Sequence, residues 1–99
     1  MNQLSLFAKI IEKSALRFTP AGVPIASAVL MHSSQQTEAG LIRLVEMEIS
    51  AIAAGDISKS FSEIPLELEC EFTGFLARKN RNSKSLVFHV TNFGMNLLD

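Results

Sequence analysis

The strictest pattern in this chain is an alternation of apolar and polar residues between Leu66 and Thr73. Every second side chain is apolar and those between are polar: Leu66, Leu68, Cys70 and Phe72 against Glu67, Glu69, Glu71 and Thr73. Because successive side chains of a β-strand point to opposite faces, this repeat predicts a strand with one face in a core and the other in water. Turn-forming residues interrupt the rest of the chain at intervals too short for a helical bundle, so we expect an all-β protein.

Extended segments with apolar residues flank this strand on both sides. The alternating strand is expected to continue past a bulge or barrel corner at Gly74. Two loops are expected in the first half, Thr19–Pro24 and the polar hairpin loop Ser33–Gly40, and a turn is expected at Asn80–Ser83. The other expected strands are Asn2–Lys13, Ile25–His32, Leu41–Ile52 and Leu86–Val90.

The segment from Ala53 to Ser62 has a different character. Asp56 is placed to be the N-cap of a short helical turn, in which Ile57 and Phe61 are neighbours on one face. A helix this short must be held by packing, so it is expected to plug something. Three strands, a plug and a two-stranded hairpin make the plan of a five-stranded OB-fold barrel, with residues 1–99 as one domain. A plain antiparallel sandwich fragment is the alternative, and the plug favours the barrel.

Composition excludes several classes of protein. The chain has 99 residues, 19% of them charged, and a formal net charge of -1, which fits one packed domain and neither a uniformly basic coat nor a polybasic membrane anchor. No apolar run is long enough to span a membrane, and Met1–Phe7 lacks the features of a signal peptide. With Cys70 as the single cysteine, we expect a reduced, cytoplasmic protein without disulfide, metal or other cofactor.

The sequence offers no set of catalytic groups. Cys70 lies on the apolar face of the alternating strand, which indicates a buried small side chain. His32 and His89 are expected near strand ends, where a hydrogen-bonded structural histidine is the more common case. Nucleophilic catalysis needs several groups that converge, and the pattern does not place these three together, so we expect no enzyme activity.

A cluster of basic residues is the most informative functional feature. Four cations with no acid among them fall on the turn between the last two strands: Arg78, Lys79, Arg81 and Lys84. One interpretation is a soluble loop tip, and the other is a flexible arm that contacts phosphates in the loop that OB barrels use for oligonucleotides. The aromatic half of such a site is poor, because the chain has no Trp or Tyr and only Phe18, Phe75 and Phe93 are candidates for exposure.

The first strand carries apolar residues on both faces, which predicts cover on two sides. A barrel core supplies one cover, and a second copy of the chain would supply the other. We therefore expect a homodimer built partly on strand one, with these interface residues: Leu4, Leu6, Phe7 and Ile11.

Several motifs together resemble one known family. Leu16-Arg17 followed by Thr19–Pro24 is similar to the first-loop signature of primosomal replication protein N, a small relative of bacterial single-stranded DNA-binding protein. Val29–Ser33 with Glu38–Gly40 is similar to that family's second strand and loop. The last hairpin completes a resemblance that runs over nearly the whole chain, with these matching segments: Gly74–Leu76, the basic loop and Leu86–His89.

The resemblance implies a function. Such proteins are non-catalytic homodimers of OB folds that bind single-stranded DNA and the primosomal helicase and help to restart replication. Arg17 lies in the first-loop signature, and Arg43 stands where the family commonly keeps a basic residue on strand three. The family's basic last loop is carried over onto four residues: Arg78, Lys79, Arg81 and Lys84.

The sequence departs from the family at two positions. Other members have aromatic residues directly after the Glu-Ala-Gly motif and five positions further on, where this chain has Leu41 and Glu46. The missing stacking surfaces predict weak binding of single-stranded DNA. The alternative is an OB-fold module for protein–protein interaction with little or no nucleic-acid binding. The residues do not separate DNA from RNA, because stacking and phosphate contact do not read the 2′-hydroxyl.

Overall fold

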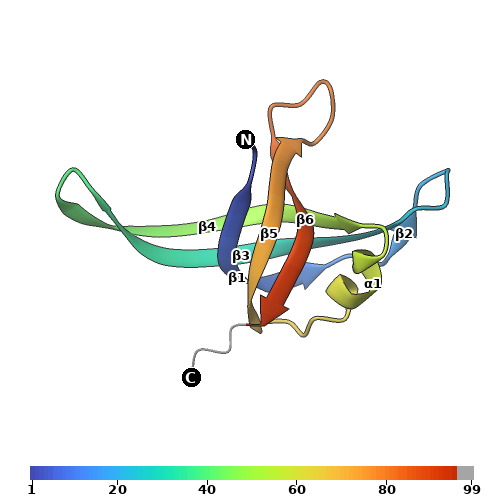
Figure 1. Ribbon diagram of the computed structural model, residues 1–99, viewed down its shortest axis with the longest axis horizontal. Helices are drawn as coiled ribbons and strands as arrows, with labels where there is room; N and C mark the ends of the chain where they lie inside the picture. Colours follow the sequence, from blue (N-terminus) through green and yellow to red (C-terminus); the bar gives the residue numbers. More distant parts are fainter. Residues whose placement is uncertain (96–99) are drawn as a thin grey trace.

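Strands dominate the part of the chain that the structure describes, residues 1–95 of a computed structural model (Figure 1). The elements in chain order are β1 (Leu4–Lys13), β2 (Arg17–Phe18), β3 (Pro24–Glu38), β4 (Leu41–Ala54), α1 (Ile57–Ser62), β5 (Glu69–Arg78) and β6 (Leu86–Met95).

The five long strands close into a barrel. The strand order is β1-β5-β6-β4-β3-β2. In addition β1 pairs with β3, and this pairing closes the row of five long strands into a barrel. Only the contact between β4 and β6 is parallel, and it covers two residue pairs, Ala51 with Phe88 and Ile52 with His89. The two-residue strand β2 adds to the outer edge of β3. The expected OB barrel, with a short helix after the third long strand, is confirmed.

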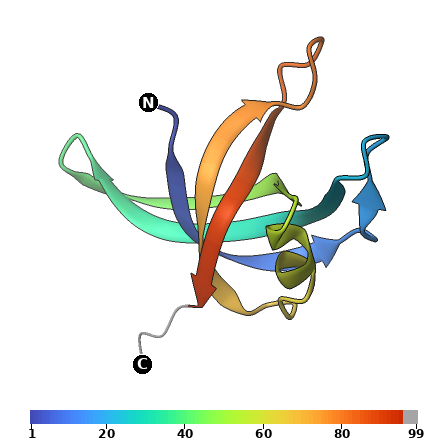
Figure 2. The ribbon, with the colours of Figure 1, turned by 45° about the vertical axis from the view of Figure 1, so that its right-hand side comes forward.

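The helix α1 closes one end of the barrel (Figure 2). Its Phe61 is 1% exposed and makes an edge-to-face contact with Phe72 of β5, with ring centroids 5.9 Å apart. The plug is therefore confirmed, but the expected side-chain cap is wrong. Asp56 makes no capping hydrogen bond. The Ser58 hydroxyl instead donates to the Gly55 carbonyl at 2.7 Å and tightens the first turn.

The hairpin between β3 and β4 is much longer than the sequence predicts. In place of a loop over Ser33–Gly40, β3 continues to Glu38 and pairs residue by residue with β4. Only Ala39 and Gly40 form the turn, with φ values of 52° and 78° that match the mirror-image type I′ turn preferred in two-residue hairpins. A run of polar side chains usually indicates a loop. Residues 33–38 are polar because both faces of this part of β3 are in contact with water, although the backbone is a regular strand.

The start of the alternating strand is also shifted. The β5 strand begins at Glu69, and Leu66, expected on its core face, is 54% exposed. Glu67 has a φ of 69°, and its backbone N–H donates to the Ile10 carbonyl at 3.0 Å. The bulge expected at Gly74 is confirmed by a register shift after Thr73. A Cβ atom on Gly74 would collide with the His89 carbonyl, so only glycine fits there.

Two hairpins leave the barrel in different directions (Figure 1). We define the arm as the protruding part of the β3–β4 hairpin, residues 33–48, and the tip as the connection between β5 and β6, residues 79–85. The molecule measures 50 Å along its longest axis and 24 Å along its shortest. No helix among residues 1–95 is long and apolar enough to cross a membrane.

Candidate nucleic-acid interface

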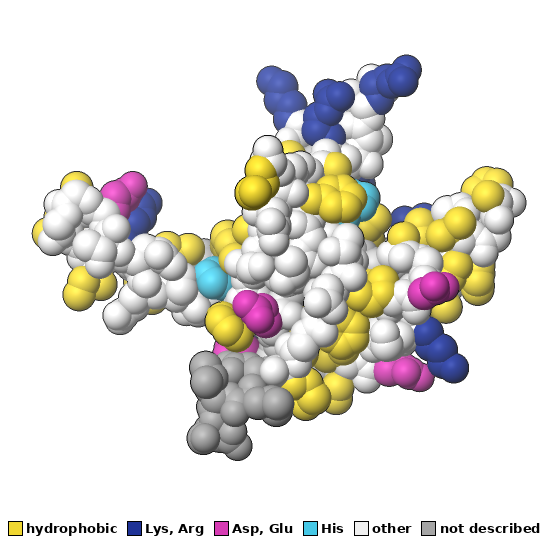
Figure 3. Space-filling model, in the orientation of Figure 1, with side chains coloured by type: hydrophobic (Ala, Val, Ile, Leu, Met, Phe, Trp, Pro, Cys, Tyr) yellow, Lys and Arg dark blue, Asp and Glu magenta, His cyan; other side chains and the backbone are white. Residues whose placement is uncertain are grey.

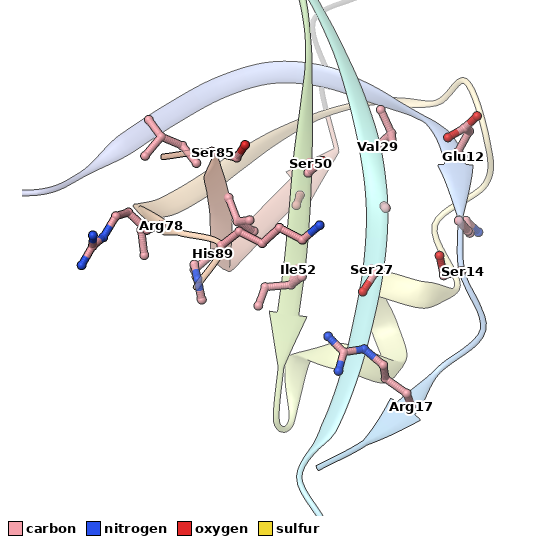
Figure 4. Close-up of a pocket in the computed structure, with 17 residues that line it drawn as sticks. Glu12, Ser14, Arg17, Ser27, Val29, Ser50, Ile52, Arg78, Ser85 and His89 are labelled. Atoms are coloured by element: carbon pink, nitrogen blue, oxygen red, sulfur yellow. The ribbon is translucent and has the colours of Figure 1, made fainter. Parts of the chain in front are cut away.

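A groove of about 860 Å³ lies on the outer face of the sheet, between β2 and the ends of β5 and β6 (Figure 4). Its floor is formed by Ser27 and Val29 of β3 and by Ser50 and Ile52 of β4. The side chains between them along each strand are buried alanines of the core, such as Ala28 and Ala51. Strand alternation therefore gives this face a shallow floor of small and β-branched side chains.

Basic residues line the groove from three separate parts of the chain. Arg17 lies on β2, Arg78 is the last residue of β5, and Lys79 follows it. In Figure 4 the Arg17 side chain points across the floor strands, whereas the Arg78 side chain points away from them. Lys13 of β1 also lines the groove, and its ammonium group donates to the Ser62 carbonyl at 3.0 Å. Lys13 carries no signal of this role in the sequence, because only the closure of the barrel brings the end of β1 to the same groove as Arg78 and Lys79. One carboxylate, that of Glu12, lines the same groove.

The other two cations of the predicted basic loop, Arg81 and Lys84, lie on the tip, where basic side chains gather at the top of the view in Figure 3. The neutral residues of the tip shape the loop. The Asn80 carboxamide oxygen accepts from the Asn82 backbone N–H at 3.0 Å, and the Ser83 hydroxyl accepts from the Ser85 backbone N–H at 3.0 Å. Within residues 1–95 no tip cation forms an ion pair, so all are available to an external anion.

Arg43 is not part of this groove. It lies on the arm and pairs with Glu38 at 3.1 Å, and both side chains are about 70% exposed. Alternation along β4 puts Arg43 on the strand face opposite to that of Ser50 and Ile52, whereas Glu46 shares their face. The structure therefore separates Arg43 from the other predicted DNA-binding residues and places a carboxylate on the groove side of the arm.

One aromatic pair stands beside the groove. The rings of Phe75 and His89 stack with centroids 4.8 Å apart and an interplanar angle of 11°. Phe75 is 39% exposed, and His89 lines the groove. Phe18 is exposed as well. Phe93, the third candidate for exposure, instead packs against Phe61 and Phe72 in the core, which is the more common place for a phenylalanine.

The candidate catalytic groups have structural roles. Burial, with a smaller contribution from the Glu69 carboxylate, raises the pKa of the Cys70 thiol, which keeps it protonated. The His32 Nδ1 donates to the Phe7 carbonyl at 2.7 Å, and its Nε2 lies 2.8 Å from the Ser34 hydroxyl. Residues 1–95 hold no group of three side chains suited to a metal ion.

The residues of the expected dimer interface fall on two faces of β1. Leu4 and Leu6 pack against the core, whereas Phe7 is 42% exposed and Ile11 is half-buried on the outward face. From Leu4 to Ala8 the strand pairs with β5 on one edge, and no other described strand pairs with its opposite edge. Of the four residues expected at the interface, Phe7 and Ile11 are therefore the two on the outward face of β1, where a second copy of the chain could contact them.

Comparison with known proteins places this geometry in a family. The model of a family described as "another single-strand binding protein family" matches residues 2–92. Replication restart protein PriB of Bordetella pertussis is 41% identical over 90 residues, which cover 91% of this chain and 84% of that protein. The protein of the same name from Nitrosomonas europaea is 42% identical over 89 residues, covering 90% and 82% of the two chains.

Solved structures agree with this similarity. PriB from Ralstonia solanacearum superposes with a TM-score of 0.90 at 38% identity, covering 97% of this chain and 98% of that one. A small single-stranded DNA-binding protein from Streptomyces coelicolor has a TM-score of 0.72 over 98% of this chain and 96% of its own. Its identity is 13%, so this second likeness concerns the fold alone.

Proposed function

This chain belongs to the single-strand binding protein family and, within it, to the PriB group of replication restart proteins, and from that membership we propose that it is a replication-restart accessory protein that binds single-stranded DNA. Its relatives named above are replication restart and single-strand binding proteins, not members of an enzyme family. We infer that the chain itself is non-catalytic.

The convergence of cations on one groove is the observation that carries the DNA-binding proposal. Arg17 and Arg78 come from segments far apart in the sequence, yet both line the groove that runs across the sheet. Single-strand binding combines a positive path for the phosphates with surfaces on which bases stack. Here Arg17, Arg78 and the tip supply the positive charge, and the stacked pair of Phe75 and His89 supplies an aromatic surface beside it.

Arg17 gives the sharpest test, because it lies outside the tip. A labelled homopyrimidine oligonucleotide is titrated at several salt concentrations, and Arg17→Ala is compared with Lys59→Ala, which removes an exposed cation from α1 outside the groove. We expect Arg17→Ala to reduce the slope of log K against log salt by up to about 0.7, the value for one phosphate contact on a single strand. Equal slopes for the two variants would show that the groove is not occupied by DNA.

We also propose a homodimer in which β1 contributes to the interface. The support is the outward apolar surface of Phe7 and Ile11 and the unpaired edge of the first half of β1. Light scattering at micromolar concentration is expected to give twice the 10.8 kDa mass of one chain. Phe7→Glu is expected to give a folded monomer, whereas Phe18→Glu, which charges an exposed phenylalanine on β2, keeps the dimer. A monomeric wild-type protein would contradict the proposal.

The proposed protein partner is a primosomal helicase, as the family resemblance implies. A second candidate function, an OB-fold module for protein–protein interaction with little or no nucleic-acid binding, is favoured by the exposed Leu41 and Glu46 on the arm. The salt titration separates the two functions. If the chain is a protein-interaction module, the wild-type protein binds the oligonucleotide no better than the Arg17→Ala variant does.

A further inference from the structure

The arm leaves one edge of β4 without a neighbouring strand. From Leu41 to Ser50, β4 pairs with β3 on one side, and the pairing with β6 on the other side begins only at Ala51. The two-residue turn makes Glu38 and Leu41 a hydrogen-bonded pair, so every second residue from Leu41 onward faces β3. The peptide groups that point away from β3 therefore belong to Ile42, Leu44, Glu46 and Glu48.

This free edge is also the apolar half of the arm. Leu41 is 72% exposed, Ile42 75% and Leu44 61%. Hydrophobic side chains show at the surface of the arm on the left of the view in Figure 3. The facing part of β3, residues 33–38, carries only polar side chains. Isolated exposed apolar residues are common, but a two-stranded hairpin with its apolar strand open on one edge is marginal in water. Such an edge is a template for another strand.

The charges on the edge indicate what kind of strand it accepts. Glu46 and Glu48 share one face of β4, and neither forms an ion pair with any residue between 1 and 95. Arg43 is already paired with Glu38. Two unpaired carboxylates repel a phosphate backbone and attract cations, so the charge of this edge is opposite to that of the groove.

A second copy of the chain does not fit the edge. When two identical edges pair about a two-fold axis, opposed side chains stand on the same face, so an even-numbered residue always meets an even-numbered one. Glu46 and Glu48 would then meet apolar residues, Ser50 or another carboxylate in every register. Arg43 has an odd number, so it never opposes them. Cross-strand pairs of these kinds are unfavourable or neutral.

We propose that the free edge of β4 binds an extended segment of another protein as an added strand, and that this segment is apolar with two Lys or Arg residues placed opposite Glu46 and Glu48. Backbone hydrogen bonds to the outward peptide groups give such a complex its affinity, and side chains at alternate positions give it specificity. The proposal concerns a surface outside the groove and does not depend on DNA binding there.

The test uses an end-blocked, fluorescently labelled peptide, Lys-Thr-Lys-Val-Val-Thr-Val, whose alternation matches the edge. Binding to the full-length protein is measured by anisotropy, with a second peptide in which both lysines are glutamates. We expect the lysine peptide to bind about tenfold more tightly, because two favourable cross-strand charge pairs are exchanged for two unfavourable ones. In the double variant Glu46→Lys, Glu48→Lys, we expect this preference to reverse.

A backbone variant tests the added strand itself. Leu44→Pro removes an N–H that points away from β3, so it is expected to leave the β3–β4 ladder intact and to abolish peptide binding. Leu44→Ala is the matched control, which removes the larger apolar side chain but keeps the N–H and some binding.

The proposal is overturned if the lysine peptide shows no binding, or if charge reversal leaves the preference for lysine unchanged. The charge-reversal variant keeps the test decisive if Leu44→Pro fails to fold. Loss of oligonucleotide binding by Leu44→Pro, with peptide binding retained, would assign the arm to nucleic acid instead. A change in molecular mass with the same variant would assign it to self-association.

Discussion

The tip and the arm are both hairpins that project from one barrel, but their surfaces have opposite chemistry. The tip carries unpaired cations on an irregular loop that is shaped by side-chain hydrogen bonds to its own backbone. The arm is a regular ladder that ends in a two-residue turn, with its one cation, Arg43, paired to Glu38. Its exposed apolar side chains and free carboxylates all lie on β4.

The difference shows that a position in an OB barrel does not by itself define a binding surface. A loop binds phosphate when its cations are free of internal partners, and the tip meets this condition. A strand binds another strand when its edge is unpaired and its side chains are apolar, and the arm meets that condition. We therefore expect phosphate contacts from the wild-type side chains of the tip and not from those of the arm, and strand addition at the arm and not at the tip.

The largest effect is expected from neutralising the tip together with the adjoining Arg78. Replacing Arg78, Lys79, Arg81 and Lys84 with Ala removes the cations that would bind up to four phosphates per chain. The slope of log K against log salt for a single-stranded oligonucleotide should shrink by up to about 0.7 for each phosphate that the variant no longer binds. All four side chains are exposed, so folding should be unaffected.

The same measurement on Arg43→Ala tests whether the two hairpins really differ in their ligands. If the arm makes no phosphate contact, this variant keeps the wild-type slope. A slope that falls as much for Arg43→Ala as for one tip residue would show that the arm also follows the DNA.

A smaller effect is expected from placing an aromatic ring on the arm. Glu46 is exposed and shares the strand face of the groove floor, so Glu46→Trp offers a stacking surface where the wild-type protein has a repelling charge. Stacking of one base contributes ~1–3 kcal/mol, so oligonucleotide binding should tighten roughly tenfold or more. Fluorescence anisotropy measures this change.

Two further variants separate the causes. Glu46→Gln isolates the charge, and the step from Gln to Trp isolates the stacking. From the sequence, Leu41→Phe is expected to act in the same direction but more weakly. In the structure Leu41 stands on the opposite face of β4, so it now serves as an internal control with little or no gain. If Trp binds no better than Gln, position 46 does not face the DNA.

The smallest effect concerns the stability of the arm. Ala39 has a positive φ of 52°, a conformation that is unfavourable for alanine and that asparagine tolerates. Ala39→Asn should raise the free energy of unfolding by about 0.5–1 kcal/mol, measured by urea denaturation. Gly40→Ala, at a φ of 78°, should lower it. A loss of stability with Ala39→Asn would show that the turn differs in solution.

Local patterns were sufficient for the architecture. The alternation from Glu69 to Phe72, the bulge at Gly74 and the apolar pair Ile57 and Phe61 each express a preference of the backbone or of one element face, and the structure confirms these three. The first part of the alternation does not form a strand, and Leu66 is exposed. The local patterns did not predict the part of β3 that is polar on both faces. Residues 33–38 have no buried face, so nothing in their hydrophobic pattern distinguishes a solvated strand from a loop.

The barrel, its plug and the cluster of cations on the tip could all be predicted from the amino-acid sequence, because short-range alternation, turn chemistry and charge are local properties. Which residues meet depends on the closed fold. Folding brings Arg17 and Lys13 to the same groove as Arg78, keeps Arg43 away on the arm, and leaves the β4 edge open. These arrangements involve residues that are distant in the chain, and the closure of the barrel fixes their positions.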